Sequence, residues 1–281
     1  MELRVKREVL APEHTFACGQ TFRFTPHDQG FRGVAGGCLV TAQTDGDETV
    51  LKILGPKKPR SVWQTYFDLD RSYSDLFPDP DPHLRKALAF APGLRVLRQD
   101  PFETLISFII SANNNIPRIS GIIGRLCQEA GRCTEEDGEV WYAFPEAEGL
   151  AAIPEDRLRE LGLGYRAPYI RKTARLMAEK DPAYLEKQDT ETLIRSLQAY
   201  PGVGPKVARC TALFGYGRFE VFPADVWILR ILRDLYGFEG SPAKADAFAR
   251  EKFGPCAGIA QQYLYHCARS HQLSLAPPGG V

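Results

Sequence analysis

The chain has 281 residues, of which 44% are hydrophobic and 25% charged, as is typical of a folded protein with a full core. Its 35 basic and 35 acidic side chains cancel, so any contact with nucleic acid must depend on local patches. No stretch approaches the roughly 18 apolar residues of a membrane span, and the first residues lack the apolar core of a signal peptide. We therefore expect a globular monomer that stays in its own compartment and does not contact a membrane.

The cysteines predict neither disulfides nor a metal centre. They are scattered, odd in number and contain no CxxC pair, which is typical of reduced thiols. An iron–sulfur cluster requires several cysteines close together, and only Cys256 and Cys267 lie near the C-terminal end. We predict no cluster and no metal. The acidic run Thr134–Asp137 is interpreted as a solvated loop.

The first part of the chain, up to about residue 65, predicts β-structure. Apolar and β-branched residues alternate over Cys38–Ala42 and Thr49–Leu54, and Asp45-Gly46-Asp47 supplies a turn, so these segments predict a hairpin. The prolines between 76 and 82 then interrupt regular structure. We place the boundary between two lobes there, giving residues 1–82 and 83–281.

Beyond this boundary the apolar residues recur at three- and four-residue spacing, which predicts helices. The fold class that follows is α+β, with an N-terminal twisted antiparallel sheet followed by an all-helical body. The predicted helices cover 83–91, 101–112, 117–130, 155–162, 166–179, 190–199, 205–215, 225–236, 242–252 and 256–270.

The most informative segment is a tight connection between two helices. A helix ends near Tyr200, Gly202-Val203-Gly204 forms the turn, and Pro205 occupies the first position of the next helix. Glycines let the backbone approach a ligand, and unpaired amides at the helix start favour an anion such as a DNA phosphate. A monovalent cation on the carbonyls of the turn could bridge to it. A plain helical hairpin, with Gly and Pro used for geometry alone, is the alternative.

Two charged residues follow this turn. Lys206 stands at the second helical position, where the helix dipole lowers the pKa of an amine and so favours its neutral, nucleophilic form. Asp225 precedes the next amphipathic helix, where aspartate is a common N-cap. A capping carboxylate is also held ionised, so it suits the stabilisation of a developing positive charge. Both interpretations of Asp225 are compatible.

Pro-Gly-Val-Gly-Pro-Lys followed by Phe-Pro-Ala-Asp resembles the helix-hairpin-helix and Gly/Pro-rich-Asp pattern of the base-excision DNA glycosylases. With the rest of the chain, from about Gly19 to Arg269, it is similar to the 8-oxoguanine DNA glycosylases. The order and spacing of several further motifs make the match specific. They are Cys18–Arg23, Leu97–Pro101, Ser111–Ile119, Leu161–Ala167 and Gly258–Gln261.

The resemblance implies an enzyme that flips 8-oxoguanine out of duplex DNA and excises it. It implies that Lys206 attacks the deoxyribose C1′ and forms a Schiff base, which permits β-elimination, and that Asp225 stabilises the cationic transition state. For the base pocket it implies that the Gly19 carbonyl accepts from the N7–H of 8-oxoguanine. Gln261 would read the Watson–Crick edge, with Cys210 and Tyr265 on the two faces of the base and Pro223 beside it.

For the DNA itself, the resemblance implies that Asn113 fills the space left by the flipped nucleotide. Arg118 and Arg166 would hold the unpaired cytosine, and Tyr165 would act as a wedge. The expected partner is therefore duplex DNA with 8-oxoguanine opposite cytosine. The expected location is the cytoplasm of a prokaryote, in association with the nucleoid, or the nucleus of a eukaryote. The chain departs from the pattern at Trp227, where a histidine that helps to hold the DNA backbone is expected.

Other interpretations stay open at this point. Asn113 is also typical of a helix end, Tyr165 and Arg166 of a solvated loop, and Cys210 and Tyr265 of a helix core. An alkylpurine or thymine-glycol glycosylase would share the hairpin and the aspartate, but the first typically lacks the lysine and the second usually carries a cluster. A non-catalytic DNA-binding module would need neither Lys206 nor Asp225.

Overall fold

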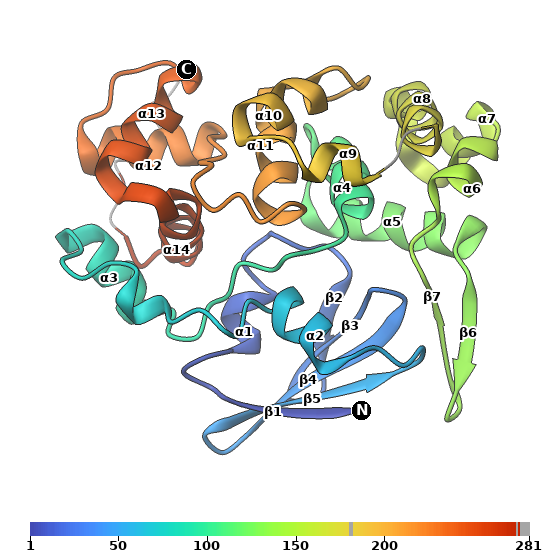
Figure 1. Cartoon of the computed structure of the whole chain (residues 1–281), viewed down its shortest axis with the longest axis horizontal. Helices are drawn as coiled ribbons and strands as arrows, with labels where there is room; N and C mark the ends of the chain where they lie inside the picture. The colour runs from blue at the N-terminus through green and yellow to red at the C-terminus, as the bar shows by residue number, and fades with distance from the viewer. Residues whose placement is uncertain (180–181, 274, 276–281) are drawn as a thin grey trace.

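A computed structural model describes residues 1–179, 182–273 and 275, with the side chains of 182 and 183 left out of the description. It consists of an antiparallel sheet beneath a helical body (Figure 1). The sheet has the strand order β1-β5-β4-β3-β2. Its strands are β1 (Glu2–Lys6), β2 (Phe24–His27), β3 (Gly30–Ala35), β4 (Cys38–Asp45) and β5 (Glu48–Leu54). The predicted α+β class is confirmed.

The predicted hairpin is the centre of this sheet. β4 and β5 pair from Leu39 opposite Leu54 to Asp45 opposite Glu48, and Gly46 turns the chain with a φ of +59°. Alternate residues of both strands are buried against a short helix, α2 (Arg60–Tyr66), which the alternation of the first lobe did not predict. The buried side chains here include Val40, Leu51, Trp63 and Phe67.

The predicted helices are all present, with small changes at their ends. The body consists of α3 (Pro82–Phe90), α4 (Pro101–Ser111), α5 (Ile116–Ala130), α6 (Ala147–Ala152), α7 (Glu155–Leu158), α8 (Ala167–Ala178), α9 (Pro182–Glu186), α10 (Thr190–Gln198), α11 (Pro205–Phe214), α12 (Val226–Tyr236), α13 (Pro242–Phe253) and α14 (Ala257–Arg269). The helix expected over 155–162 is α-helical only as far as Leu158 and continues as a π-helical turn over Arg159–Leu163, within which Gly162 has a φ of +100°. No helix in the described ranges is long and apolar enough to cross a membrane.

Local sequence explains where several of these helices begin. Asp81, Asp100, Asn115, Asp189 and Asp225 each precede a helix and accept a hydrogen bond from a backbone amide of its first turn. A side chain that satisfies such an amide stabilises a helix by about 1 kcal/mol. These caps set the starting points of α3, α4, α5, α10 and α12, and the last two of these helices flank the candidate site.

The acidic run Thr134–Asp137 is not a loop, and the helical body is therefore not helical throughout. β6 (Cys133–Glu136) and β7 (Glu139–Tyr142) form a two-stranded hairpin there. The turn residues Asp137 and Gly138 both have positive φ, as a two-residue hairpin requires. Buried Trp141 anchors the hairpin and donates from Nε1 to the Gly37 carbonyl at 3.0 Å. The acidic side chains are exposed, as expected.

The sheet and the helical body meet along the segment that follows α1 (Pro12–Thr15). Cys18 and Phe22 from the first lobe belong to the buried core of the helical body, together with Tyr73 and Phe77. Helix α14 lies beside α3 and also contacts this segment, because Gln262 donates to the Cys18 carbonyl at 2.7 Å. Gly19 is thus held at the junction of the two parts. The division after residue 82 stays a prediction.

Candidate active site

The turn between α10 and α11 has the geometry that its glycines predict. Gly202 has a φ of +79°, and a Cβ built on it would lie 2.9 Å from the Cβ of Tyr169. Gly204 faces open space and is the N-cap of α11, where it offers no side-chain oxygen to the first-turn amides. These amides are open to an anion at the positive end of the helix dipole. The phosphate and the cation expected here stay predictions.

Lys206 lies on the first turn of α11, with its ammonium 5.0 Å from the centre of the Phe108 ring. Cys210, Asp225 and Tyr265 are all close enough to shift its pKa. The structure therefore brings together a lysine, a thiol, a carboxylate and a tyrosine that come from three separate segments of the chain.

The direction of the Lys206 pKa corrects the sequence expectation. Burial lowers this pKa, but Cys210, Asp225 and Tyr265 raise it, and it stands above the ordinary lysine value. Burial also raises the pKa of the Cys210 thiol. The helix dipole alone predicted a lowered pKa for Lys206, whereas its three neighbours, Cys210 first among them, raise it. Near pH 7 Lys206 is therefore an ammonium, which has to lose a proton before it can act as a nucleophile.

Asp225 is an N-cap, as its position predicted. Its Oδ1 accepts from the amides of Trp227 at 3.0 Å and Ile228 at 2.9 Å. These contacts orient the carboxylate at the start of α12 while it stays close enough to Lys206 to raise that pKa. Capping and electrostatic stabilisation are thus compatible in one side chain.

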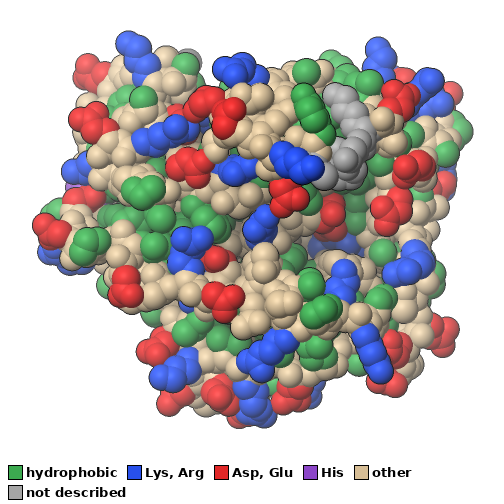
Figure 2. Space-filling view, viewed as in Figure 1, with side chains coloured by type: hydrophobic (Ala, Val, Ile, Leu, Met, Phe, Trp, Pro, Cys, Tyr) green, Lys and Arg blue, Asp and Glu red, His purple; other side chains and the backbone are tan. Residues whose placement is uncertain are grey.

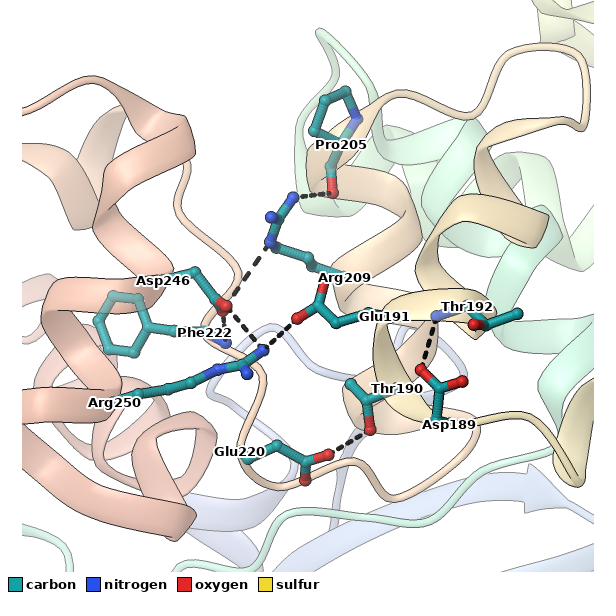
Figure 3. Close-up of polar contacts among 10 residues, drawn as sticks. All are labelled: Asp189, Thr190, Glu191, Thr192, Pro205, Arg209, Glu220, Phe222, Asp246 and Arg250. Atoms are coloured by element: carbon teal, nitrogen blue, oxygen red, sulfur yellow. Dashed lines mark hydrogen bonds and ion pairs between the residues drawn. The ribbon is translucent and has the colours of Figure 1, made fainter.

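A partly buried polar network holds the segment that leads to Asp225 (Figure 3). Asp246 of α13 is 7% exposed, and it accepts from the amide of Phe222 at 2.8 Å. Arg250 bridges Asp246 at 2.8 Å and Glu191 of α10 at 2.9 Å, and Arg209 of α11 lies 3.8 Å from Asp246. The network joins both helices of the hairpin to the Asp225 segment. The sequence showed no signal for it, because its members lie in four separate elements.

Gly19 and Tyr265 face each other in the expected base pocket. Gly19 has a φ of +76°, and a Cβ on it would lie 3.6 Å from Cε1 of Tyr265. Two glutamines hold its neighbours: Gln262 donates to the Cys18 carbonyl, and Gln20 accepts from the amide of Leu97 at 2.8 Å. The sequence analysis did not identify either glutamine as a residue that supports the backbone around Gly19. Their signal was a polar side chain in an apolar surrounding.

The other expected base-binding residues lie on buried faces. Gln261 is 6% exposed, and its Oε1 has no hydrogen-bond partner among the described residues. A buried amide oxygen left unpaired costs about 1–3 kcal/mol, so this oxygen favours a ligand with a donor. Cys210 and Pro223 are buried as well. Their roles on a base stay predictions.

Three of the residues expected at the DNA gap form one cluster. Asn113 is exposed with a φ of +50°, in the left-handed region. Arg166 is 4% exposed, donates to the carbonyls of Ala112 and Asn113, and stacks on Tyr165 with 4.4 Å from its guanidinium carbon to the ring centre. Arg118 lies exposed on the first turn of α5 and makes no side-chain hydrogen bond or ion pair within the described part of the chain.

The charged side chains of the surface are mixed in sign. Figure 2 shows acidic and basic side chains interspersed over one face of the molecule, which agrees with the net charge of zero. The described residues contain no group of three or more His, Cys, Asp or Glu side chains that could hold a metal ion.

Known proteins match this chain over nearly its whole length. Residues 2–105 match the family described as 8-oxoguanine DNA glycosylase, N-terminal domain, and residues 106–255 match the HhH-GPD superfamily base excision DNA repair proteins. The N-glycosylase/DNA lyase OGG1 of Arabidopsis thaliana is 33% identical over 94% of this chain and 78% of its own length. The N-glycosylase/DNA lyase of Saccharomyces cerevisiae is 41% identical over 61% of this chain and 50% of its own.

A solved structure also matches nearly the whole of this chain. The Clostridium acetobutylicum 8-oxoguanine glycosylase/lyase, in complex with duplex DNA containing cytosine opposite 8-oxoguanine, has a TM-score of 0.88. It is 36% identical, and the match covers 96% of this chain and 94% of that one. The chain belongs to the HhH-GPD superfamily of base excision DNA repair proteins and, within it, to the 8-oxoguanine N-glycosylase/DNA lyases.

Proposed function

We propose that this protein excises 8-oxoguanine paired with cytosine from duplex DNA and then cleaves the strand at the abasic site. The observation that carries the proposal is the placement of Lys206 beside Asp225, at the start of a helix that follows an open glycine turn. A module that only binds DNA needs the turn but has no use for a half-buried lysine beside a carboxylate.

The chemistry follows from these two side chains. A base inside the stack cannot be attacked, so the nucleotide must leave the helix, which costs a few kcal/mol. The amine of Lys206, once deprotonated, forms a bond to C1′ while the bond from C1′ to N9 breaks and its electron pair leaves with the base. Asp225 stabilises the positive charge that develops on the sugar. The C1′–O4′ bond of the resulting aminal then breaks, O4′ takes up the proton that the lysine nitrogen gives up, and the Schiff base forms. It makes the C2′ proton acidic, and loss of that proton to a base expels the 3′ phosphate.

Selection of the base would fall to Gly19 and Gln261. The Gly19 carbonyl would accept from the N7–H of 8-oxoguanine but would meet a lone pair in guanine, a difference of about 1–3 kcal/mol. Support comes from the left-handed φ of Gly19 and from the hydrogen bond of Gln262 that holds Cys18 in place. The unpaired Oε1 of buried Gln261 supplies an acceptor for the Watson–Crick edge.

The opposite strand would be read by the cluster around Asn113. We propose that Asn113 fills the gap, that Tyr165 wedges beside it, and that Arg118 and Arg166 hold the cytosine. Arg166 would have to exchange its contacts with the 112–113 backbone for contacts with the base. The turn Gly202–Gly204 would hold a phosphate, with or without a bridging monovalent cation. We also propose that the protein acts as a monomer, in the nucleoid of a prokaryote or in a nucleus.

Borohydride trapping on a duplex with one 8-oxoguanine opposite cytosine tests the proposal. Wild type should give a covalent adduct, and Lys206→Gln should give none. Lys244→Gln, which removes an exposed lysine on α13 outside the proposed machinery, is the matched control and should trap like wild type. Base release without an adduct would move catalysis to a water activated by Asp225. If wild type binds the duplex without releasing the base, the protein would be a binding module.

A further inference from the structure

Trp227 stands where the family pattern led us to expect a histidine that holds the DNA backbone. It lies on the first turn of α12, two residues after Asp225, and 36% of its surface is exposed. Its neighbour Val226 is 79% exposed. An indole has no charge with which to hold a phosphate, so another group beside the site must supply that charge if the contact is made.

Two arginines lie close to this indole. The guanidinium carbon of Arg230 is 5.6 Å from the ring centre of Trp227, and that of Arg269 is 5.9 Å from it. Arg230 is engaged with Asp234, at 3.4 Å. Arg269, at the end of α14, forms no ion pair with any carboxylate in the described part of the chain. Its positive charge is therefore available to a ligand.

Arg269 is also linked to the base pocket. Its Nη1 donates to the hydroxyl of Tyr265 at 3.3 Å, and its guanidinium carbon lies 5.8 Å from the Tyr265 ring centre. Tyr265 in turn lies close enough to Lys206 and Asp225 for these groups to affect its pKa. An exposed arginine thus stands beside the tyrosine that faces Gly19, at the edge of the site that holds the nucleophile.

We infer that Arg269, placed by Trp227 and Tyr265, binds a backbone phosphate of the damaged strand next to the flipped nucleotide. The inference rests on the proposed function. Phosphates flank the sugar whose C1′ Lys206 would attack. The guanidinium of Arg269 is separated from Lys206 by the side chain of Tyr265, so it is placed to reach one of these phosphates. A guanidinium that lies against aromatic rings keeps N–H donors at its edge for phosphate oxygens.

The test is the salt dependence of binding to a duplex that carries a stable tetrahydrofuran abasic analogue opposite cytosine. This probe has phosphates but no damaged base, so it separates a phosphate contact from a base contact. Arg269→Gln should bind about tenfold more weakly at moderate salt. The slope of log K against log salt should fall by about one. Arg85→Gln, an exposed arginine on α3, is the matched control and should leave both quantities unchanged.

Two further variants keep the result interpretable. Tyr265→Phe removes the hydroxyl but keeps the ring, and it should retain the wild-type salt slope. Trp227→Ala removes one aromatic neighbour and should weaken binding in wild type more than in Arg269→Gln, because both changes act on one contact. Thermal unfolding of each variant checks that the protein stays folded.

Different results overturn different statements. If Arg269→Gln keeps the wild-type affinity and slope, the inference is wrong, whereas 8-oxoguanine excision by wild type would still support the proposed function. If Arg269→Gln loses only excision of 8-oxoguanine, Arg269 acts on the base or through Tyr265, and the phosphate contact is also wrong. If wild type neither binds this duplex nor excises the base, the proposed function itself fails.

Discussion

Asp246 accepts a hydrogen bond of 2.8 Å from the amide of Phe222, three residues before Asp225. The bond fixes the backbone of the segment that delivers the carboxylate to Lys206. The arginines that contact Asp246 connect it to the helix that carries this lysine and to the helix before it. Asp246 thus supports the backbone that leads to Asp225 from outside the candidate site.

Asp246→Asn should slow excision while leaving affinity for an abasic duplex near that of wild type. The asparagine oxygen can still accept from Phe222, but the charge that binds Arg209 and Arg250 is lost. Chemical denaturation should show a loss of about 1–3 kcal/mol in the free energy of unfolding. The pH profile of Schiff-base trapping should also move, because a displaced Asp225 no longer raises the pKa of Lys206. Asp156→Asn, at an exposed position on α7, is the control. A lower rate with an unmoved profile would reduce Asp246 to a purely structural role.

The two glycines of the turn should respond differently to alanine. At Gly202 the φ of +79° and the close approach of Tyr169 make a side chain strained, so Gly202→Ala should lower the free energy of unfolding by about 1–3 kcal/mol. Gly204 has ordinary φ and open space around it, so Gly204→Ala should fold as wild type does. Its methyl group would nevertheless stand in the way of a phosphate and weaken DNA binding. Calorimetry measures the unfolding of the two variants, and binding titrations measure their affinity for DNA. Normal DNA binding by Gly204→Ala would contradict a phosphate at this turn.

The reaction of Lys206 with a preformed abasic aldehyde should depend on pH in a direction set by the raised pKa of its amine. Because the pKa of Lys206 is raised, little neutral amine is present at pH 7, and trapping should become faster as the pH rises. Cys210→Ala removes the neighbour that raises this pKa most, so the rise should begin at lower pH. Asp225→Asn removes a carboxyl group that also raises this pKa, so its profile should move in the same direction. Trapping rates from pH 6 to 10 measure the three profiles. An unchanged profile in Asp225→Asn would show that another group sets the lysine pKa.

A buried histidine pair between α1 and α14 should make stability depend on pH. His14 Nδ1 and His266 Nε2 lie 3.1 Å apart. Burial and the neighbouring His14 lower the pKa of His266 to about 4, and burial lowers that of His14, while Glu13 opposes this shift. A lowered pKa means that the unfolded chain binds more protons. Stability is therefore full above the unfolded value of about 6.5 and falls as the pH drops toward 4.

Urea unfolding at pH 7, 5.5 and 4.5 measures this loss, which should be on the order of 1–3 kcal/mol for the pair. His266→Gln cannot titrate and should flatten the pH dependence, whatever its stability at pH 7. An equally steep dependence in this variant would assign the effect to other groups.

Several features of the fold were readable from sequence because their causes are local. Gly202 and Gly204 permit a tight turn and Pro205 fixes φ at the start of a helix, so these three residues predicted the hairpin between α10 and α11 without any contact from elsewhere in the chain. Asp225 as a helix cap depends only on amides two and three residues away. The hairpin of β6 and β7 had such a signal as well, in Asp137-Gly138 between strand-forming residues, and the acidic side chains around it obscured it.

The tertiary structure decided what distant segments do to one another. It placed Tyr265 against Gly19, tied Asp246 to Phe222, and put Arg269 beside Trp227. The expected direction of the Lys206 pKa is also reversed, because Cys210, one turn along the same helix, and Asp225 and Tyr265, from two other segments, raise it. Local backbone preferences act over a few residues and are written in the order of the chain. Electrostatic and packing energies depend on distances in space, and these distances exist only once the chain has folded.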